Sequence, residues 1–186
     1  MDLSDINTRL HPAAKEFLFQ YYNTLRKIFY KALGHLEMEY MAIALLNPQG
    51  EWLFFSSRPS IEYNLIEKKL WQFDAIYQED FLIKNKPQFW HEFYTTKGCN
   101  LLHYYKQLKP EISLGISLPS LFKTYRVVYS FGLHTHTAFT QNKLIHNTEA
   151  LIRMGQFCLQ QIMRAIPLPK TVNYLASSAS IFEPNQ

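Results

Sequence analysis

Few residues in this chain have the types and spacing that chemistry requires, and three histidines come first. His134 and His136 alternate along a predicted strand, so both imidazoles would lie on one face, and His146 could join them. This spacing can hold zinc. However, no acidic or cysteine ligand stands at a supporting interval, and paired histidines at a strand end usually face solvent. We therefore expect no metal centre and no cofactor.

Nucleophiles and phosphate-binding loops give no positive signal either. No serine or cysteine lies in a recognisable nucleophile elbow, and the six glycines form no glycine-rich loop. A set of acid, base and nucleophile cannot be named from the sequence, so we predict that the chain is not an enzyme. An enzyme acting on an acyl substrate stays open as a third hypothesis, behind two that follow below.

Composition and charge favour one compact domain. The 186 residues are 47% hydrophobic, enough for a core that buries roughly two-thirds of the unfolded surface. The aromatic content of 16% suits either the lining of a small-molecule site or an aromatic-rich core. The net charge of +4 comes from scattered basic residues, without the stripe or motif typical of nucleic-acid binding. We expect no DNA binding by this chain itself.

Several features suit a cytoplasmic protein without a membrane partner. Cys99 and Cys158 have no metal-type spacing and fit a reducing compartment. The first ten residues carry two Asp and lack the apolar core of a secretory signal. No stretch approaches the roughly 18 apolar residues that a membrane span needs.

The elements that must position any site follow from hydrophobic periodicity. Amphipathic helices are predicted over 12–33 and 144–166, a mixed helical segment over 61–81, and a further helix or irregular segment over 100–107. Strands are predicted over 40–46, 52–56, 112–118 and 125–133, and the turn Asn47-Pro48-Gln49-Gly50 makes the first two a hairpin. The segment 61–81 is expected to turn its charges to solvent: Glu62, Glu67, Lys68 and Lys69.

This order of elements favours an α+β fold. Strands on both sides of a helical insertion form one antiparallel sheet most readily, because hairpins need only short turns. We expect an α/β/α sandwich of the GAF and PAS kind, with helices on both faces of the sheet and a pocket between the sheet and the insertion. The domain would cover residues 1–168. The tail 169–186, rich in Ser, Ala and Asn, would be disordered or loosely docked.

Four short elements give a more specific signal through their order: Phe73-Asp74, Pro87-Gln88-Phe89-Trp90, Gly115-Ile116-Ser117-Leu118-Pro119 and Val127-Val128-Tyr129-Ser130-Phe131. The series resembles the N-terminal autoinducer-binding domain of LuxR-type transcriptional regulators, over about residues 15–166. The resemblance implies a quorum-sensing domain, working as a homodimer, that binds a lipophilic acyl-homoserine-lactone-like signal between sheet and helices. The helix-turn-helix module of the family is not visible.

The resemblance also implies roles for single residues. Asp74 would accept a hydrogen bond from the ligand's amide N–H, and Trp90 would contact the lactone head. Gly115 would be a packing glycine where backbone or ligand approaches the strand closely. Plainer alternatives are that Trp90 is an ordinary core residue, and that Asp74 caps a helix or forms a salt bridge to Lys68, Lys69 or Lys84.

The sequence departs from the family where the ligand's carbonyl oxygens would be bound. A Trp and a Tyr are usual there, but Ile61 and Leu65 stand in their places and cannot donate. Tyr63 and Trp71 lie nearby and could substitute. The full candidate ligand-binding set is Phe54, Tyr63, Trp71, Asp74, Tyr77, Trp90, Gly115 and Ser130. The alternative function is a ligand-independent dimerisation or interaction module that modulates a full-length regulator, and a fully packed pocket would favour it.

Overall fold

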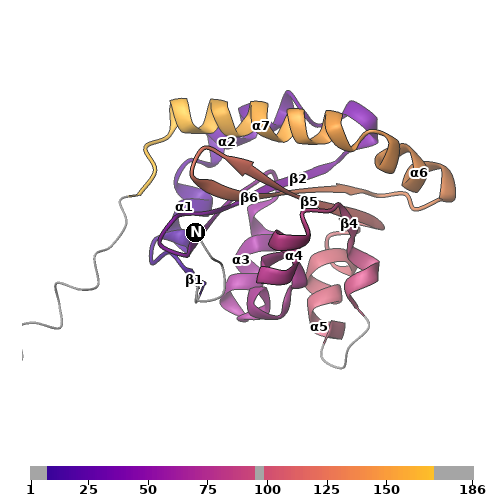
Figure 1. Cartoon of the computed structure of the whole chain (residues 1–186), viewed down its shortest axis with the longest axis horizontal. Coiled ribbons are helices and arrows are strands. Elements are labelled where there is room, and N and C mark those ends of the chain that lie inside the picture. The colour runs from indigo at the N-terminus through magenta and orange to yellow at the C-terminus, as the bar shows by residue number, and fades with distance from the viewer. Residues whose placement is uncertain (1–7, 95–98, 170–186) are drawn as a thin grey trace, which may run out of the picture.

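A six-stranded sheet with helices on both faces forms the centre of the protein (Figure 1). The computed structural model describes residues 8–94 and 99–169, so the predicted behaviour of the tail falls almost wholly outside the described residues. The strand order is β1-β3-β2-β6-β5-β4. This confirms the predicted α+β sandwich. One edge differs from the expected antiparallel sheet, because β1 (Arg9–Leu10) pairs parallel with β3.

Two hairpins supply the four long strands. β2 (Tyr40–Leu46) and β3 (Glu51–Ser56) form the first, and β5 (Leu114–Phe122) and β6 (Tyr125–Leu133) the second. β2 and β6 pair antiparallel at the centre, and the short β4 (Gln88–Phe89) pairs with β5 at the edge. The four predicted strands are confirmed within a few residues. β1 and β4 were not predicted, because two residues are too few to show a period.

Alternation along the strands decides which residues can reach a site. Ala42 of β2 pairs with Ser56 on one side and Ser130 on the other, and Ser130 pairs with Ser117. These small side chains form a row across one face of the sheet, since successive side chains point to opposite faces. The neighbouring positions, such as Tyr129 of β6, therefore face the other way.

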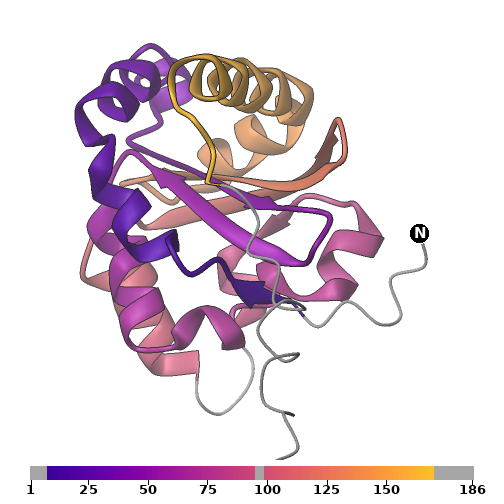
Figure 2. The same ribbon diagram turned by 90° about the vertical axis from the view of Figure 1, so that its left-hand side faces the viewer.

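The Tyr129 face is covered by α2 (Tyr22–Tyr30) and α7 (Thr148–Ala165), which pack against each other. Figures 1 and 2 show both helices on the same side of the sheet. A Cβ atom at Gly155 would lie 2.5 Å from the Tyr129 ring, so the glycine lets α7 approach the sheet. No helix among residues 8–94 and 99–169, the 18-residue α7 included, is long and apolar enough to span a bilayer.

Both predicted long helices are divided. The first becomes α1 (Ala14–Gln20) and α2, with Tyr21 at φ −114° between them. The second becomes α6 (Ala138–His146) and α7, with Asn147 between them at φ −112°. The Asn147 side chain donates to the carbonyl oxygen of Lys143 at 2.7 Å, a local bond that competes with a continuous helix. The apolar residues keep a helical spacing across such a break, so the sequence pattern does not reveal it.

The opposite face is covered by short helical pieces. Several of them divide the one segment predicted over 61–81, and the last two form the helix or irregular segment predicted over 100–107. They are α3 (Pro59–Glu67), η2 (Leu70–Phe73), η3 (Ala75–Tyr77), α4 (Glu79–Lys84), η4 (Trp90–Phe93), α5 (Cys99–His103) and the π-helical η5 (Tyr104–Leu108). A further turn, η1 (His35–Glu37), precedes β2. Lys69 and Asn85 have φ of 57° and 47°, and these left-handed residues separate the pieces.

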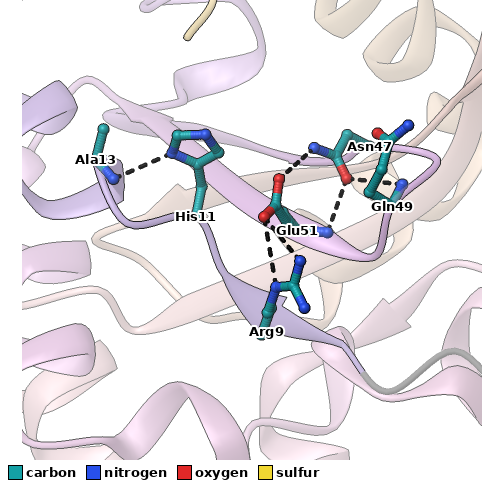
Figure 3. Close-up of polar contacts among 6 residues, drawn as sticks. All are labelled: Arg9, His11, Ala13, Asn47, Gln49 and Glu51. Carbon is teal, nitrogen blue, oxygen red and sulfur yellow. Dashed lines mark hydrogen bonds and ion pairs between the residues drawn. The ribbon is translucent and has the colours of Figure 1, made fainter. Parts of the chain in front are cut away.

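The first hairpin is fixed by its turn and by β1 (Figure 3). Asn47 accepts backbone N–H bonds from Gln49 and Glu51 at 3.0 and 2.8 Å, and its side-chain amide donates to Glu51 Oε2 at 3.0 Å. Glu51 also accepts from Arg9 Nη2 at 3.1 Å. The predicted hairpin turn is thus confirmed, and its buried Glu51 links it to the strand at the sheet edge.

Candidate ligand-binding site

Three segments that are far apart in sequence bring Asp74, Trp90 and Lys106 together on the face that carries Ser130. Lys106 Nζ lies 2.5 Å from Asp74 Oδ2, and both side chains are buried, with exposed fractions of 3% and 1%. The same ammonium lies 4.4 Å from the centre of the Trp90 ring. A buried ion pair with a cation–π contact therefore occupies the place that the sequence assigned to a ligand head group.

Asp74 fulfils both of its plainer alternatives, but with a different lysine. Its Oδ1 atom accepts a long bond of 3.4 Å from the backbone N–H of Ile76, so it caps η3. Its salt-bridge partner is Lys106, and the alternatives Lys68, Lys69 and Lys84 were wrong. The partner lies 32 positions away, beyond the reach of local spacing arguments.

The π-helical turn explains how a lysine comes to lie inside the protein. A π turn changes the angular step between residues, and here two consecutive side chains, Lys106 and Gln107, are both buried. Gln107 Nε2 donates to the carbonyl oxygen of Ile112 at 3.1 Å, which holds the turn against the start of the second hairpin. Burial lowers the pKa of Lys106, and the adjacent Asp74 carboxylate opposes that shift.

Trp90 has internal partners on all sides. Its Nε1–H donates to Ser117 Oγ at 2.9 Å, and Ser117 Oγ bonds Ser130 Oγ at 2.7 Å. The edge of Tyr40 meets the indole at a centroid distance of 5.7 Å. A Cβ atom at Gly115 would lie 2.1 Å from two ring carbons of Trp90. Gly115 therefore packs against Trp90, and Ser130 belongs to the same hydrogen-bonded row.

A second buried acid lies on this face and was missed by the sequence analysis. Glu62, expected on the solvent side, is buried, and its Oε1 accepts a hydrogen bond from the Tyr40 hydroxyl. Burial raises the pKa of Glu62 to about 7, although the Ser56 and Tyr40 side chains and the charge of Lys106 oppose the shift. The available signal was that Glu62 precedes Leu65 by three residues, which places both on one helical face.

An aromatic wall of Trp52, Phe54 and Tyr77 lies on the same side of the sheet. Tyr77 meets Trp52 and Phe54 edge-on, with centroid distances of 5.3 Å in both cases. All three side chains are buried, and burial, followed by the Asp74 charge, raises the pKa of Tyr77. The predicted residues Phe54 and Tyr77 are thus brought together, and the structure adds Trp52.

Tyr63 and Trp71, the proposed substitutes for binding the ligand's carbonyl oxygens, differ in their burial. Tyr63 is half-buried and contacts Phe19 at a centroid distance of 5.6 Å, with Lys15 Nζ 5.1 Å above its ring. Trp71 is buried in η2. Ile61 and Leu65 are buried as apolar side chains of α3, so these two family positions offer no hydrogen-bond donor.

Several surface cavities lie away from this cluster. Four cavities of about 270, 390, 780 and 430 Å³ open at the surface of the described part of the chain. None of these four is lined by Asp74, Trp90 or Lys106. At the cluster itself Asp74, Trp90 and Lys106 contact one another and Ser117, and such packing favours the interaction-module alternative.

The histidines have separate partners. His134 contacts Glu39 and the carbonyl oxygen of Glu111. His136 bonds Gln141 at 3.2 Å, and its ring lies 5.3 Å from that of His91. Among the residues that the structure describes, no three His, Cys, Asp or Glu side chains are grouped as a metal ion would need.

The arrangement of sheet, insertion and helices is that of the autoinducer-binding domains of LuxR-type regulators. The chain superposes on Escherichia coli SdiA with a TM-score of 0.58 and 12% identity, over 86% of this chain and 72% of that one. SdiA in complex with octanoyl-rac-glycerol gives 0.55 and 11%, over 88% and 70%. CepR2 of Burkholderia cenocepacia, an N-acylhomoserine-lactone-dependent LuxR-family factor, gives 0.57 and 12%, over 81% and 92%. No family model and no curated protein sequence matches the chain.

Proposed function

We propose that the chain is a signal-sensing regulatory domain of the LuxR type, which binds a small lipophilic acyl molecule between the sheet and the helical insertion. The observation that carries the proposal is the burial of Asp74 beside Trp90 in this fold. A carboxylate with a 1% exposed fraction is costly to place in a protein interior.

Two further observations support an acyl ligand. The wall of Trp52, Phe54 and Tyr77 offers apolar surface next to polar groups, which is the usual make-up of a small-molecule site. In addition, one neighbour in fold was solved with octanoyl-rac-glycerol and another is named as dependent on N-acylhomoserine lactone. The proposal includes a cytoplasmic location and a homodimer.

The test is to find the signal on the protein itself. Native mass spectrometry of protein purified from cell extract, followed by organic extraction, should reveal a co-purifying acyl molecule. A thermal-shift series should then show a melting temperature that rises with ligand concentration, because a ligand that binds the folded state stabilises it by mass action. The series should include octanoyl-glycerol, fatty acids and acyl-homoserine lactones.

A matched pair of variants connects the thermal shift to the site. Phe54→Leu alters the aromatic wall, whereas Phe139→Leu makes the same change at a side chain that is 73% exposed. The ligand-induced shift should shrink in Phe54→Leu and stay at the wild-type value in Phe139→Leu. Absence of any bound lipid and of any shift would overturn the proposal.

One specific observation favours a second candidate, the ligand-independent interaction module. Asp74 and Trp90 already have internal partners, Lys106 and Ser117, so the cluster is satisfied without a ligand. Light scattering coupled to gel filtration tests this candidate with ligand-free protein. A dimer that lactones and lipids leave unchanged would support it, and a stable monomer would contradict it.

A further inference from the structure

We propose that Lys106 determines the specificity of this site by excluding signals that present an uncharged N–H group to Asp74, acyl-homoserine lactones among them. The inference rests on the proposed function, and it names the class of signal that the site would accept. The Lys106 ammonium holds the position at Asp74 Oδ2 that an amide donor would need.

An amide that binds Asp74 would have to replace the Lys106 ammonium. Lys106 Nζ lies 2.5 Å from Oδ2, and the other oxygen of Asp74 faces the backbone N–H of Ile76. A charged donor makes a shorter and roughly twice as strong hydrogen bond as a neutral one. An incoming amide would also leave a buried ammonium and a buried carboxylate without their mutual compensation, which is strongly unfavourable.

The surroundings of Lys106 oppose its withdrawal from Asp74. Its side chain has an exposed fraction of 3%, and its ammonium is stacked on Trp90. The π-helical turn behind it is fastened by Gln107, which donates to the carbonyl oxygens of Ile112 and Ser113 at 3.1 and 3.4 Å. Withdrawal of Lys106 from Asp74 would therefore break the contact with Trp90 and displace this turn.

The site face carries buried polar atoms to which a ligand could still form hydrogen bonds. Trp52 Nε1 and Glu62 Oε2 are buried and have no hydrogen-bond partner among the described residues. The indole is a donor, the Glu62 oxygen is an acceptor when the carboxylate is ionised, and both side chains lie on the site face. A hydroxyl or ester oxygen can accept from the indole, and a hydroxyl can donate to the carboxylate. The favoured signal is an acyl molecule with an uncharged, hydroxyl-bearing head group.

The experiment compares Lys106→Met with Lys109→Met, which removes the same charge from an exposed position three residues away. Binding of N-octanoyl-homoserine lactone and of octanoyl-glycerol to both variants and to the wild type is measured by calorimetry. We expect Lys106→Met to bind the lactone at least about ten-fold more tightly than the wild type, equivalent to about 1.4 kcal/mol. Lys109→Met should match the wild type with both ligands.

The outcomes separate this inference from the function on which it rests. Equal affinity of wild type and Lys106→Met for the lactone, with octanoyl-glycerol or lactone bound by both, overturns the inference and leaves the proposed function standing. Absence of binding of any acyl molecule to any of the three proteins overturns the proposed function and the inference together.

A further readout covers the case in which Lys106→Met does not fold alone. The soluble yield of the variant is then measured in cells grown with and without the lactone, and with octane as an apolar control. A yield that rises with the lactone and not with octane supports the inference, because the amide would replace the missing ammonium at Asp74. A yield that is the same in all three cultures contradicts it.

Discussion

The Trp90 indole packs directly against the backbone of Gly115. The indole of Trp90 occupies the space beside β5 where any side chain at position 115 would begin, with two ring carbons 2.1 Å from the ideal Cβ position. The strand therefore depends on a glycine here for close packing and not for an unusual backbone angle. This contact fixes the depth at which η4 sits against the sheet and, through the indole, the position of Lys106.

Gly115→Ala should destabilise the protein because Trp90 cannot keep its place. Inserting a methyl group into a packed core typically costs about 1–3 kcal/mol, and we expect the upper part of that range or more. Urea denaturation measures the free energy of unfolding. In the double variant with Trp90→Phe the effect of Gly115→Ala should be smaller, and additive effects would show that the two residues do not interlock.

Ser117→Ala should cost about 1–3 kcal/mol, because Trp90 Nε1 would be left buried without its acceptor. The control is Ser113→Ala, an exposed serine just before the same strand, for which we expect less than about 0.5 kcal/mol. Thermal or urea unfolding of both variants decides the matter. Equal losses would mean that the buried hydrogen bond contributes nothing specific.

Asp74→Asn should destabilise the protein by about 3–5 kcal/mol, because the buried Lys106 ammonium loses its counter-charge. Replacing both partners, in Asp74→Asn with Lys106→Met, should recover a large part of that loss. The exposed pair Glu149–Arg153 provides the control, and Glu149→Gln should change stability by less than about 1 kcal/mol. A double variant as unstable as the sum of its single changes would contradict this account.

Glu62 should make stability fall as pH rises through neutrality. Its pKa in the folded protein is about 7, above the usual value of about 4.3 for an unfolded chain. The folded state therefore binds the extra proton between these values, and the stabilisation present below about pH 4 is lost as pH rises to about 7. The shift corresponds to roughly 2–4 kcal/mol.

The comparison is with Glu62→Gln, which keeps the shape and cannot ionise. The stability difference between variant and wild type, measured by urea unfolding from pH 4 to pH 8, should move in favour of the variant as pH rises. A constant difference across that range would show that Glu62 does not titrate near neutrality in the folded protein.

The four long strands and the α+β class could be predicted because they depend on local signals. The Asn47 turn, the apolar run Tyr40–Leu46 and the strand Tyr125–Leu133 reflect short-range chemistry, and the structure has them as expected. β1 could not be predicted, since its pairing with Glu51 and Trp52 comes from a distant segment and not from any period of its own.

Of the three residues that form the candidate site, two were named from the sequence and the lysine was not. Asp74 and Trp90 were found through the order of motifs along the chain. Lys106 was not, because its burial depends on a π-helical turn that has no reliable sequence pattern. Glu62 was placed on the wrong side for a related reason: a charge in a helix is usually exposed, and only its tertiary partner Tyr40 makes burial tolerable.

The two shortest strands have a consequence for self-association. β1 and β4, of two residues each, close the sheet at its two ends. Sheet edges with free backbone groups are templates for pairing with other chains, and short, charged edge strands prevent that growth. Arg9, at the β1 edge, puts such a charge next to Glu51. Loss of the segment before α1 would expose the backbone of β3 at Glu51 and Trp52, where another chain could then pair.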